Sequence, residues 1–295
     1  MRRAYRRESA RVGGSWHAVV TVAGADGLPV TAVDERADEV VAAASVNKLG
    51  IACALLDKID KGTLALDRTV DLTPDLVIVG SGLYHLQTVW GERLTLANVL
   101  TTMLVASDNT AVRLCGLVCT GTEVNTYLAG LGLAHTRVEP LAADPRRMYL
   151  GTTTAREIHT LLYRLADGTL LSPAATGFLL DLLRSPGGNH DGVRHTMSSA
   201  ERAATAIKHG ADENARHEVG VMFDVAGTPR IVFSLLAELP GHGQNFGATN
   251  PLVQARARLG RRMRDLVGLL SAPPTGPIEQ NHPDQPAGRP DQPEG

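Results

Sequence analysis

The stretch "SVNK", residues 45–48, stands between the small residues "VAAA" and the apolar stretch "LGIACALL". Only four of the 29 basic residues in the chain are lysines, and the other 25 are arginines. Arginine keeps its proton in proteins, whereas lysine can release it when it is desolvated or lies beside another charge. Lys48 follows Ser45 by one helical turn, so this pair points to proton transfer, although Ser-x-x-Lys alone is a weak signal.

The elements on either side of this stretch differ in their period. Residues 16–35 alternate apolar and polar side chains around "GADG" and predict two strands joined by a turn. Residues 45–61 carry apolar side chains at helical spacing and end at Gly62, which predicts a helix. Further helices are expected up to residue 199, interrupted at residues 136–151, where no usable period predicts a long ordered loop.

The end of the chain returns to strands, predicted at 203–210, 217–227 and 229–239, and to an amphipathic helix at 250–270. The predicted fold class is therefore α/β (α+β). An antiparallel five-stranded sheet is flanked by helices, and an all-helical subdomain is inserted between its second and third strands. The cleft between the two subdomains would be the natural ligand site.

The predicted domain organisation has three parts. A basic N-terminal segment precedes one large domain, and a Pro-rich polar tail, predicted to be disordered, follows it. Within the large domain, the two ends form a sheet subdomain and the middle forms a helical one. The boundaries are 1–14 for the basic segment, 15–270 for the large domain (sheet 15–44 and 200–270, helices about 45–199) and 271–295 for the tail.

Composition argues against several classes of partner. The net charge of −2 favours neither nucleic acid nor an acidic membrane as the main partner. No histidine pair has a metal-ligand spacing, and three cysteines without a framework pattern indicate reduced, buried thiols. We therefore predict no metal, no cofactor, no nucleic acid and no membrane. A small-molecule substrate and a monomeric state are further expectations, which composition does not test.

The N-terminus begins with basic residues but no apolar run of signal-peptide length follows them. As written, the sequence predicts a cytoplasmic protein. A true start codon farther upstream would instead make the protein an exported one.

Three short motifs stand in a characteristic order, namely Ser45-Val46-Asn47-Lys48, Ser107-Asp108-Asn109 and Lys208-His209-Gly210. Each is weak alone, but together, on a helix start, a helix-ending turn and a strand end, they form a strong signal. The chain resembles the class A serine β-lactamases and their penicillin-binding relatives, whose motifs are S-x-x-K, S-D-N and K-T-G. The resemblance covers roughly residues 15 to 270.

The motif residues can be read as a catalytic set. Ser45 would be the nucleophile, and Lys48, its pKa lowered by burial and by Lys208, would accept the proton. Ser107 would pass a proton to the leaving nitrogen. Asn109 would hold Lys48 and a substrate amide, and Lys208 would attract a substrate carboxylate.

The resemblance implies an oxyanion hole made of the backbone N–H groups of Ser45 and Ala211. Such donors are worth about 3 kcal/mol each in a transition state. Gly210 and His209 would line the substrate site beside them. In place of His209 the family has threonine or serine, so the floor of the pocket would change. His217 is expected to be structural, and Tyr84 to be either a cleft wall or a core residue.

In class A enzymes a loop glutamate activates the water that releases the acyl group. The stretch Arg137-Val138-Glu139-Pro140 resembles the start of that loop, which makes Glu139 the candidate. The next residues depart from the family pattern, because Ala143 stands where the family has asparagine and Gly151 where it has aspartate. Asp144 is a possible replacement, and acylation is better supported than fast turnover.

The first interpretation is a β-lactamase-like serine hydrolase that forms an acyl-enzyme with a β-lactam or similar cyclic amide. The alternative is a serine hydrolase of the same fold acting on an ester, a peptide or a biosynthetic intermediate. The missing export signal, the altered loop and His209 favour this alternative. A third interpretation is a non-catalytic binding paralogue, against which the intact serine and lysine residues of all three motifs argue.

Overall fold

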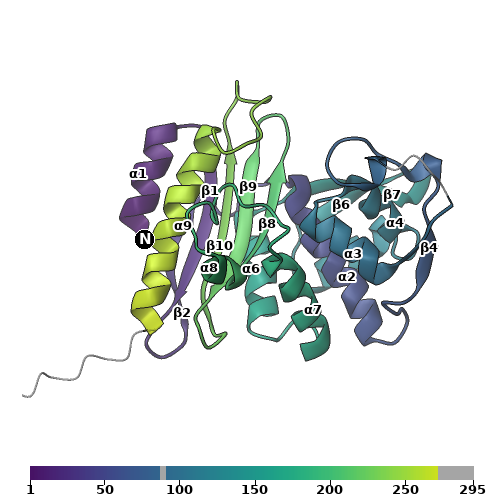
Figure 1. The fold of residues 1–295 in the computed structure, drawn as a ribbon, viewed down its shortest axis with the longest axis horizontal. Coiled ribbons are helices and arrows are strands. Elements are labelled where there is room, and N and C mark those ends of the chain that lie inside the picture. The colour runs from purple at the N-terminus through teal and green to yellow at the C-terminus, as the bar shows by residue number, and fades with distance from the viewer. Residues whose placement is uncertain (87–90, 272–295) are drawn as a thin grey trace, which may run out of the picture.

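A five-stranded antiparallel sheet forms the centre of the protein in a computed structural model, which describes residues 1–86 and 91–271. Its strand order is β2-β1-β10-β9-β8, so both ends of the chain contribute to one sheet (Figure 1). β1 pairs with β10 from Ser15 opposite Glu238 to Val22 opposite Ile231. The predicted five-stranded sheet is thereby confirmed. Its strands are β1 (Ser15–Ala23), β2 (Pro29–Glu35), β8 (Thr205–Ala211), β9 (Arg216–Phe223) and β10 (Pro229–Glu238).

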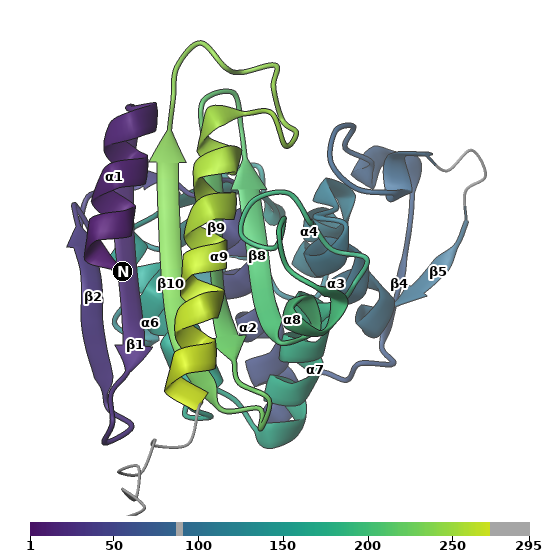
Figure 2. The ribbon, with the colours of Figure 1, turned by 60° about the vertical axis from the view of Figure 1, so that its left-hand side comes forward.

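Helices cover both faces of this sheet. The helices α1 (Arg2–Val12) and α9 (Pro251–Ser271) lie side by side on one face (Figures 1 and 2). Helix α6 (Ala155–Ala166) and the inserted segment pack against the other. All eight residues of β9 are buried, as expected for a strand covered on both sides.

The insertion between β2 and β8 is mainly helical, but the prediction of an all-helical subdomain is wrong. Strands β4 and β5 pair with each other, and β3, β7 and β6 form a three-stranded sheet. The inserted helices and turns are η1 (Ala44–Asn47), α2 (Lys48–Asp60), η2 (Pro74–Leu76), η3 (Tyr84–Leu86), α3 (Leu96–Val105), α4 (Asn109–Gly116), α5 (Gly121–Gly130), α6, α7 (Pro173–Arg184) and α8 (Ser199–Ala203). The inserted strands are β3 (Val41–Ala42), β4 (Thr69–Asp71), β5 (Arg93–Thr95), β6 (Arg137–Leu141) and β7 (Asp144–Thr153).

The long loop predicted at 136–151 is in fact the hairpin of β6 and β7. Its alternation of apolar and polar residues is weak, and its register shifts twice, so the sequence carries little strand signal. A side chain helps to hold it. The Asn125 amide donates to Val138 O and accepts from Val138 N, both at 2.9 Å, in the manner of a neighbouring strand. The hairpin therefore depends on contacts from helix α5 that lie outside its own sequence.

The segment predicted as a basic N-terminus folds as helix α1. Tyr5 is buried and meets Trp16 of β1 edge to face, with ring centroids 6.1 Å apart. The proposed tail lies outside the described residues, except for Ser271, which ends α9. Within residues 1–86 and 91–271, no helix has both the length and the apolar character that crossing a bilayer requires.

Candidate active site

Ser45 lies in the short turn η1, which leads directly into helix α2. The residue before it, Ala44, has a φ of 44°, in the left-handed region that non-glycine residues seldom adopt. Such strain is commonly found at functional positions. The Ser45 side chain is buried, and no hydrogen bond engages its hydroxyl in the described part of the chain. The hydroxyl is therefore free to meet a substrate.

Asn47 fixes the turn from the other side. Its amide nitrogen donates to three backbone carbonyls of the β6–β7 hairpin, Arg137 O at 3.1 Å, Leu150 O at 2.6 Å and Thr152 O at 2.9 Å. The hairpin therefore stabilises η1, the turn that contains Ser45. This role was not predicted, because Asn47 fills one of the two unspecified positions of the Ser-x-x-Lys motif.

Lys48 is fully buried and its ammonium group reaches the second motif. Its Nζ donates to Ser107 O at 2.6 Å, to Ser107 Oγ at 3.3 Å and to Asn109 Oδ1 at 2.8 Å. Burial lowers the pKa of Lys48 to about 7, although the Asp108 carboxylate acts in the opposite direction. A lysine with such a pKa can accept a proton near neutral pH.

Lys208 approaches the same hydroxyl from the sheet. Its Nζ donates to Ser107 Oγ at 3.0 Å and to His209 O at 2.8 Å. Burial lowers the pKa of Lys208 well below its usual range, and repulsion from Lys48 lowers it further. The structure thus brings Lys48, Ser107, Asn109 and Lys208 into one hydrogen-bonded group, as their motifs predict.

The turn at residues 107–109 is held by Asp108, which lies between the two polar motif residues. Ser107, just after the end of α3, has a φ of 54°, in the left-handed region that non-glycine residues seldom adopt. The Asp108 carboxylate caps α4 by accepting from Ala111 N at 2.9 Å, and also accepts from Leu83 N at 2.6 Å and Tyr84 N at 2.9 Å. One buried carboxylate therefore fixes both the turn and the segment across from it.

Replacing Asp108 with alanine would leave three N–H groups without their acceptor, two of them buried and that of Leu83 partly buried. We expect this change to lower the free energy of unfolding by about 3 kcal/mol, since each orphaned donor costs about 1–3 kcal/mol. Urea unfolding measures this loss. Asp108→Asn keeps one acceptor oxygen and should recover part of it. An alanine variant as stable as the parent would contradict this role.

Gly210, at the end of β8, lies against the serine turn. A Cβ atom added to it would stand 2.9 Å from Ser45 N and 3.0 Å from Val46 N. Any larger residue would therefore push the strand away from the turn, whereas glycine lets the two backbones approach closely. Gly210 and Ala211 both line the cleft in which Ser45 lies.

This cleft has a volume of about 690 Å³ and lies between the sheet and the insertion. Side chains of both parts line it, including Ser45, Ser107, Asn109 and His209 from the predicted set. Several other lining residues were not predicted, because they have no motif of their own and arrive from α9, from the start of β9 and from the loops before α8 and after β10. They include Asp191, Arg216, Phe246 and Arg256.

A family model and solved structures both resemble this chain. The model of the Beta-lactamase enzyme family matches residues 16–266. The chain belongs to the β-lactamase enzyme family. No curated protein sequence matches this family member significantly.

Solved structures share the fold of this β-lactamase family member. A β-lactamase from Sphaerobacter thermophilus is 22% identical, with 90% of this chain and 96% of that chain covered and a TM-score of 0.72. A β-lactamase from Burkholderia vietnamiensis is 21% identical, with 90% and 96% covered and a TM-score of 0.73. A mutant of PBP-A in an acyl-enzyme complex with penicillin G is 20% identical, with 89% and 97% covered and a TM-score of 0.70.

The histidines of this β-lactamase-like serine hydrolase have different surroundings. His217 accepts from Ala237 N through Nδ1 at 3.1 Å, so its proton is on Nε2, which donates to Ala42 O at 2.9 Å. His217 thus joins β9 to β10 and β3, although its ring also borders the cleft. Burial lowers the pKa of His209 well below its usual range, and nearby Lys208 and Arg256 lower it further. The cleft therefore presents a neutral imidazole at position 209.

Glu139 is not brought to this cleft. It lies on β6, opposite Tyr149, with its side chain exposed, and does not line the cavity around Ser45. Hairpin formation explains the difference, because pairing with β7 directs the backbone along a strand instead of a loop. Gly151 is explained in the same way. Its φ is 62°, and a Cβ atom there would lie 2.1 Å from Arg137 O, so the hairpin has no room for an aspartate.

Two smaller predictions concern Tyr84 and Asp144. Tyr84 is a core residue, with its hydroxyl 2.7 Å from Thr102 Oγ1, and does not line the cleft. Asp144 binds Arg146 at 2.9 Å at the tip of the hairpin, outside the cleft. Neither residue contributes to the chemistry at Ser45.

Proposed function

We propose that Ser45 of this β-lactamase family member opens β-lactam rings and forms an acyl-enzyme, with Lys48 as the base. The observation that supports this most directly is the meeting of Lys48 and Lys208 at Ser107 Oγ, beside the cleft that holds Ser45. A serine needs a neighbouring base, and a buried lysine with a pKa of about 7 supplies one.

The proposed steps use the groups in that cleft. Ser45 Oγ attacks the lactam carbonyl and its proton passes to Lys48 Nζ. The backbone N–H groups of Ser45 and Ala211 hold the oxyanion. When the C–N bond breaks, Ser107 gives its proton to the nitrogen and regains one from the lysine pair. Asn109, His209 and Gly210 border the substrate, and Lys208 favours a substrate carboxylate. All these residues belong to one chain, which is consistent with the predicted monomer.

Release of the acyl group is the slow step of the proposed cycle. The exposed position of Glu139 removes the carboxylate that class A relatives use to activate water. The acyl-enzyme should therefore accumulate during turnover. Mixing the protein with a chromogenic cephalosporin should give a burst of about one equivalent, followed by a slower steady rate. A linear time course without a burst would contradict slow release.

Glu139→Gln tests the position of this carboxylate. We expect the rate of acyl-enzyme breakdown to change by less than about threefold, because a surface carboxylate distant from the acyl group has no proton to move. The decay of the benzylpenicillin adduct, followed by intact-protein mass, measures this rate. A loss of 100-fold or more would mean that Glu139 reaches the cleft in the working enzyme.

A further inference from the structure

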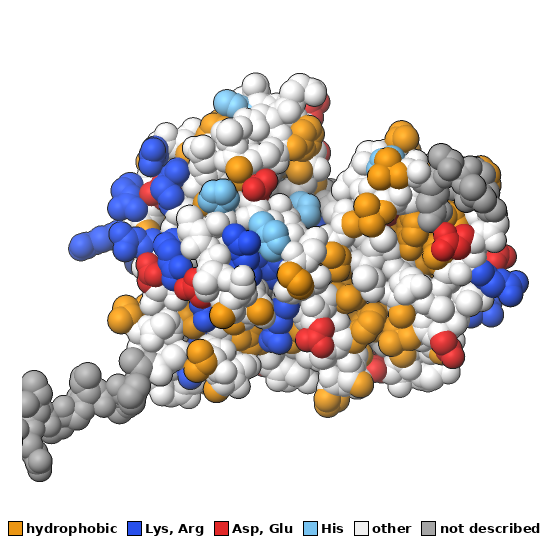
Figure 3. All heavy atoms as spheres, viewed as in Figure 1, with side chains coloured by type: hydrophobic (Ala, Val, Ile, Leu, Met, Phe, Trp, Pro, Cys, Tyr) orange, Lys and Arg blue, Asp and Glu red, His pale blue; other side chains and the backbone are white. Residues whose placement is uncertain are grey.

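The net charge of −2 conceals a strong separation of charge. Helices α1 and α9 together contain ten arginines and only two carboxylates, Glu8 and Asp265. Their net charge is therefore +8, and the rest of the chain carries −10. The two helices lie side by side on the outer face of the sheet (Figures 1 and 2), and Lys and Arg side chains gather over that end of the molecule (Figure 3).

Several of these arginines are held around one buried carboxylate. Glu8 is 2% exposed, and its oxygens lie 2.5 Å from Arg258 Nε, 3.1 Å from Arg7 Nε and 3.9 Å from Arg11 Nη1. The side chains of Arg7 and Arg11 are otherwise well exposed. The single carboxylate of Glu8 thus holds three guanidinium groups close together. Two of their three positive charges remain uncompensated.

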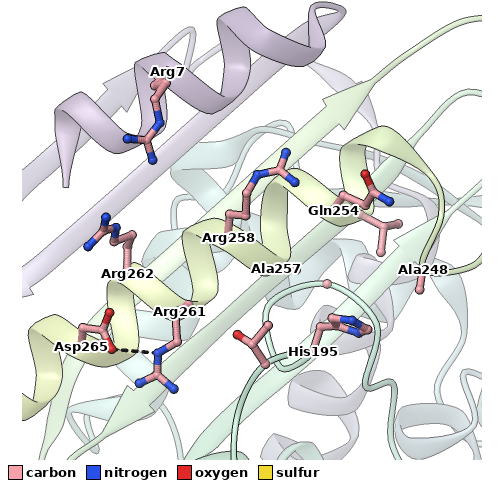
Figure 4. A pocket seen from close by; sticks show the side chains of 12 residues that line it. Arg7, His195, Ala248, Gln254, Ala257, Arg258, Arg261, Arg262 and Asp265 are labelled. Atoms are coloured by element: carbon pink, nitrogen blue, oxygen red, sulfur yellow. Dashed lines mark hydrogen bonds and ion pairs between the residues drawn. The ribbon is translucent and has the colours of Figure 1, made fainter.

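A cavity of about 540 Å³ extends this arrangement along α9. Arg258 and Arg262 line it from the side of α9 that faces α1, and Arg7 lines it from α1 (Figure 4). Asp265 is the only carboxylate that lines it among the described residues, and it is paired with Arg261 at 2.8 Å. Arg262 makes no hydrogen bond or ion pair with any residue in 1–86 or 91–271.

We propose that Arg7, Arg11, Arg258 and Arg262, here called the arginine surface, bind a ligand with clustered phosphate groups. A planar guanidinium group can donate two parallel hydrogen bonds to two oxygens of one phosphate. The ammonium group of lysine lacks this geometry, so arginine binds phosphate more specifically. The buried Glu8 holds part of the surface in place before a ligand arrives, which reduces the entropy lost on binding. Soluble polyphosphates and the headgroups of an acidic bilayer share this chemistry.

The arginine surface is separate from the Ser45 cleft. It lies on α1 and α9, on the outer side of the sheet, whereas the catalytic lysines reach Ser107 from β8 and α2 on the inner side. The cavity beside this surface shares Val253 with the Ser45 cleft, but none of the four arginines lines that cleft, so binding to them does not require the proposed β-lactam chemistry. The two can be tested separately in the same protein.

The test is calorimetric titration of the full-length protein with inorganic tripolyphosphate at low salt. The double variant Arg7→Gln, Arg262→Gln leaves the bond between Glu8 and Arg258 intact and removes two exposed guanidinium groups. The control, Lys61→Gln with Arg93→Gln, removes the same charge from exposed positions on the insertion. We expect the dissociation constant to rise at least about tenfold in the first variant and less than twofold in the control. β-Lactam hydrolysis should be unchanged in both.

Sedimentation with phosphatidylglycerol and phosphatidylcholine vesicles distinguishes the two sources of phosphate. Binding of tripolyphosphate alone would identify a soluble ligand. Capture by phosphatidylglycerol but not phosphatidylcholine vesicles, released when tripolyphosphate is added, would identify lipid headgroups. Absence of binding to both probes would overturn the proposal, and so would equal weakening in the two variants, because attraction to overall charge would then suffice.

Discussion

Ser45→Ala is expected to lower β-lactam hydrolysis by at least about 1,000-fold, because losing the nucleophile of an acyl-transfer site has effects of this size or larger. The substituted side chain is buried in a turn and makes no hydrogen bond within the described residues, so folding should not suffer. Initial rates with a chromogenic cephalosporin measure the loss. Unfolding in urea should give the same midpoint for variant and parent.

Ser81→Ala provides a matched control. Ser81 lines the same cleft, and its hydroxyl donates only a long bond of 3.4 Å to Ala106 O. We expect its rate to stay within about threefold of the parent, since among the described residues neither Lys48 nor Lys208 is hydrogen-bonded to its hydroxyl. If Ser45→Ala kept the parental rate, or if Ser81→Ala lost as much, the nucleophile would have to lie elsewhere in the cleft.

Changing Lys48 should have the next largest effect. Lys48→Ala removes the proposed base and should slow acylation by about 100- to 10,000-fold, the usual contribution of general-base catalysis. Lys48→Arg keeps the positive charge but cannot release a proton, so it should be impaired to a similar extent. Stopped-flow measurement of the burst gives the acylation rate directly. Nearly normal acylation in the arginine variant would show that the charge matters and the proton does not.

The same base predicts a pH dependence. Only neutral Lys48 can accept the serine proton, and its pKa is lowered to about 7. The acylation rate should therefore rise about tenfold per pH unit below pH 7 and level off above it. A rate constant that does not change between pH 5 and 8 would contradict this assignment. The comparison must use the burst phase, because the steady rate reports acyl release.

The elements around the nucleophile were predictable because their patterns are strong. The helix at 45–61 has a clear apolar period, and the structure confirms it as η1 and α2. The strands at both ends of the large domain alternate or are wholly apolar, as strands of a covered sheet should be. Motif order then indicated which ends of these elements meet.

Two parts of the fold could not be predicted because their stability comes from elsewhere. The β6–β7 hairpin depends on the amides of Asn47 and Asn125, which belong to other elements. Helix α1 has few apolar residues and is held by Tyr5 against Trp16 and by Glu8 against Arg258. The residues that stabilise the hairpin and helix α1 lie outside these segments, so the local sequence pattern does not predict either element.

In the candidate active site too, some residues could be predicted from the sequence and others could not. Lys48, Ser107, Asn109 and Lys208 were predictable because each belongs to a motif with fixed spacing. Cleft residues such as Arg256 have no motif, and only the packing of α9 against β9 and β10 brings them near Ser45. Glu139, by contrast, was predicted to lie in the cleft from its spacing to Ser45, but it lies outside it.

The most direct test of the account is the mass of the intact protein over time after mixing with benzylpenicillin. We predict an adduct with the mass of the drug, located on the peptide that contains Ser45, absent from Ser45→Ala and decaying slowly. Its slow decay should be unchanged in Glu139→Gln. Failure to form any adduct, or an adduct that persists in Ser45→Ala, would show that Ser45 is not the residue acylated by β-lactams.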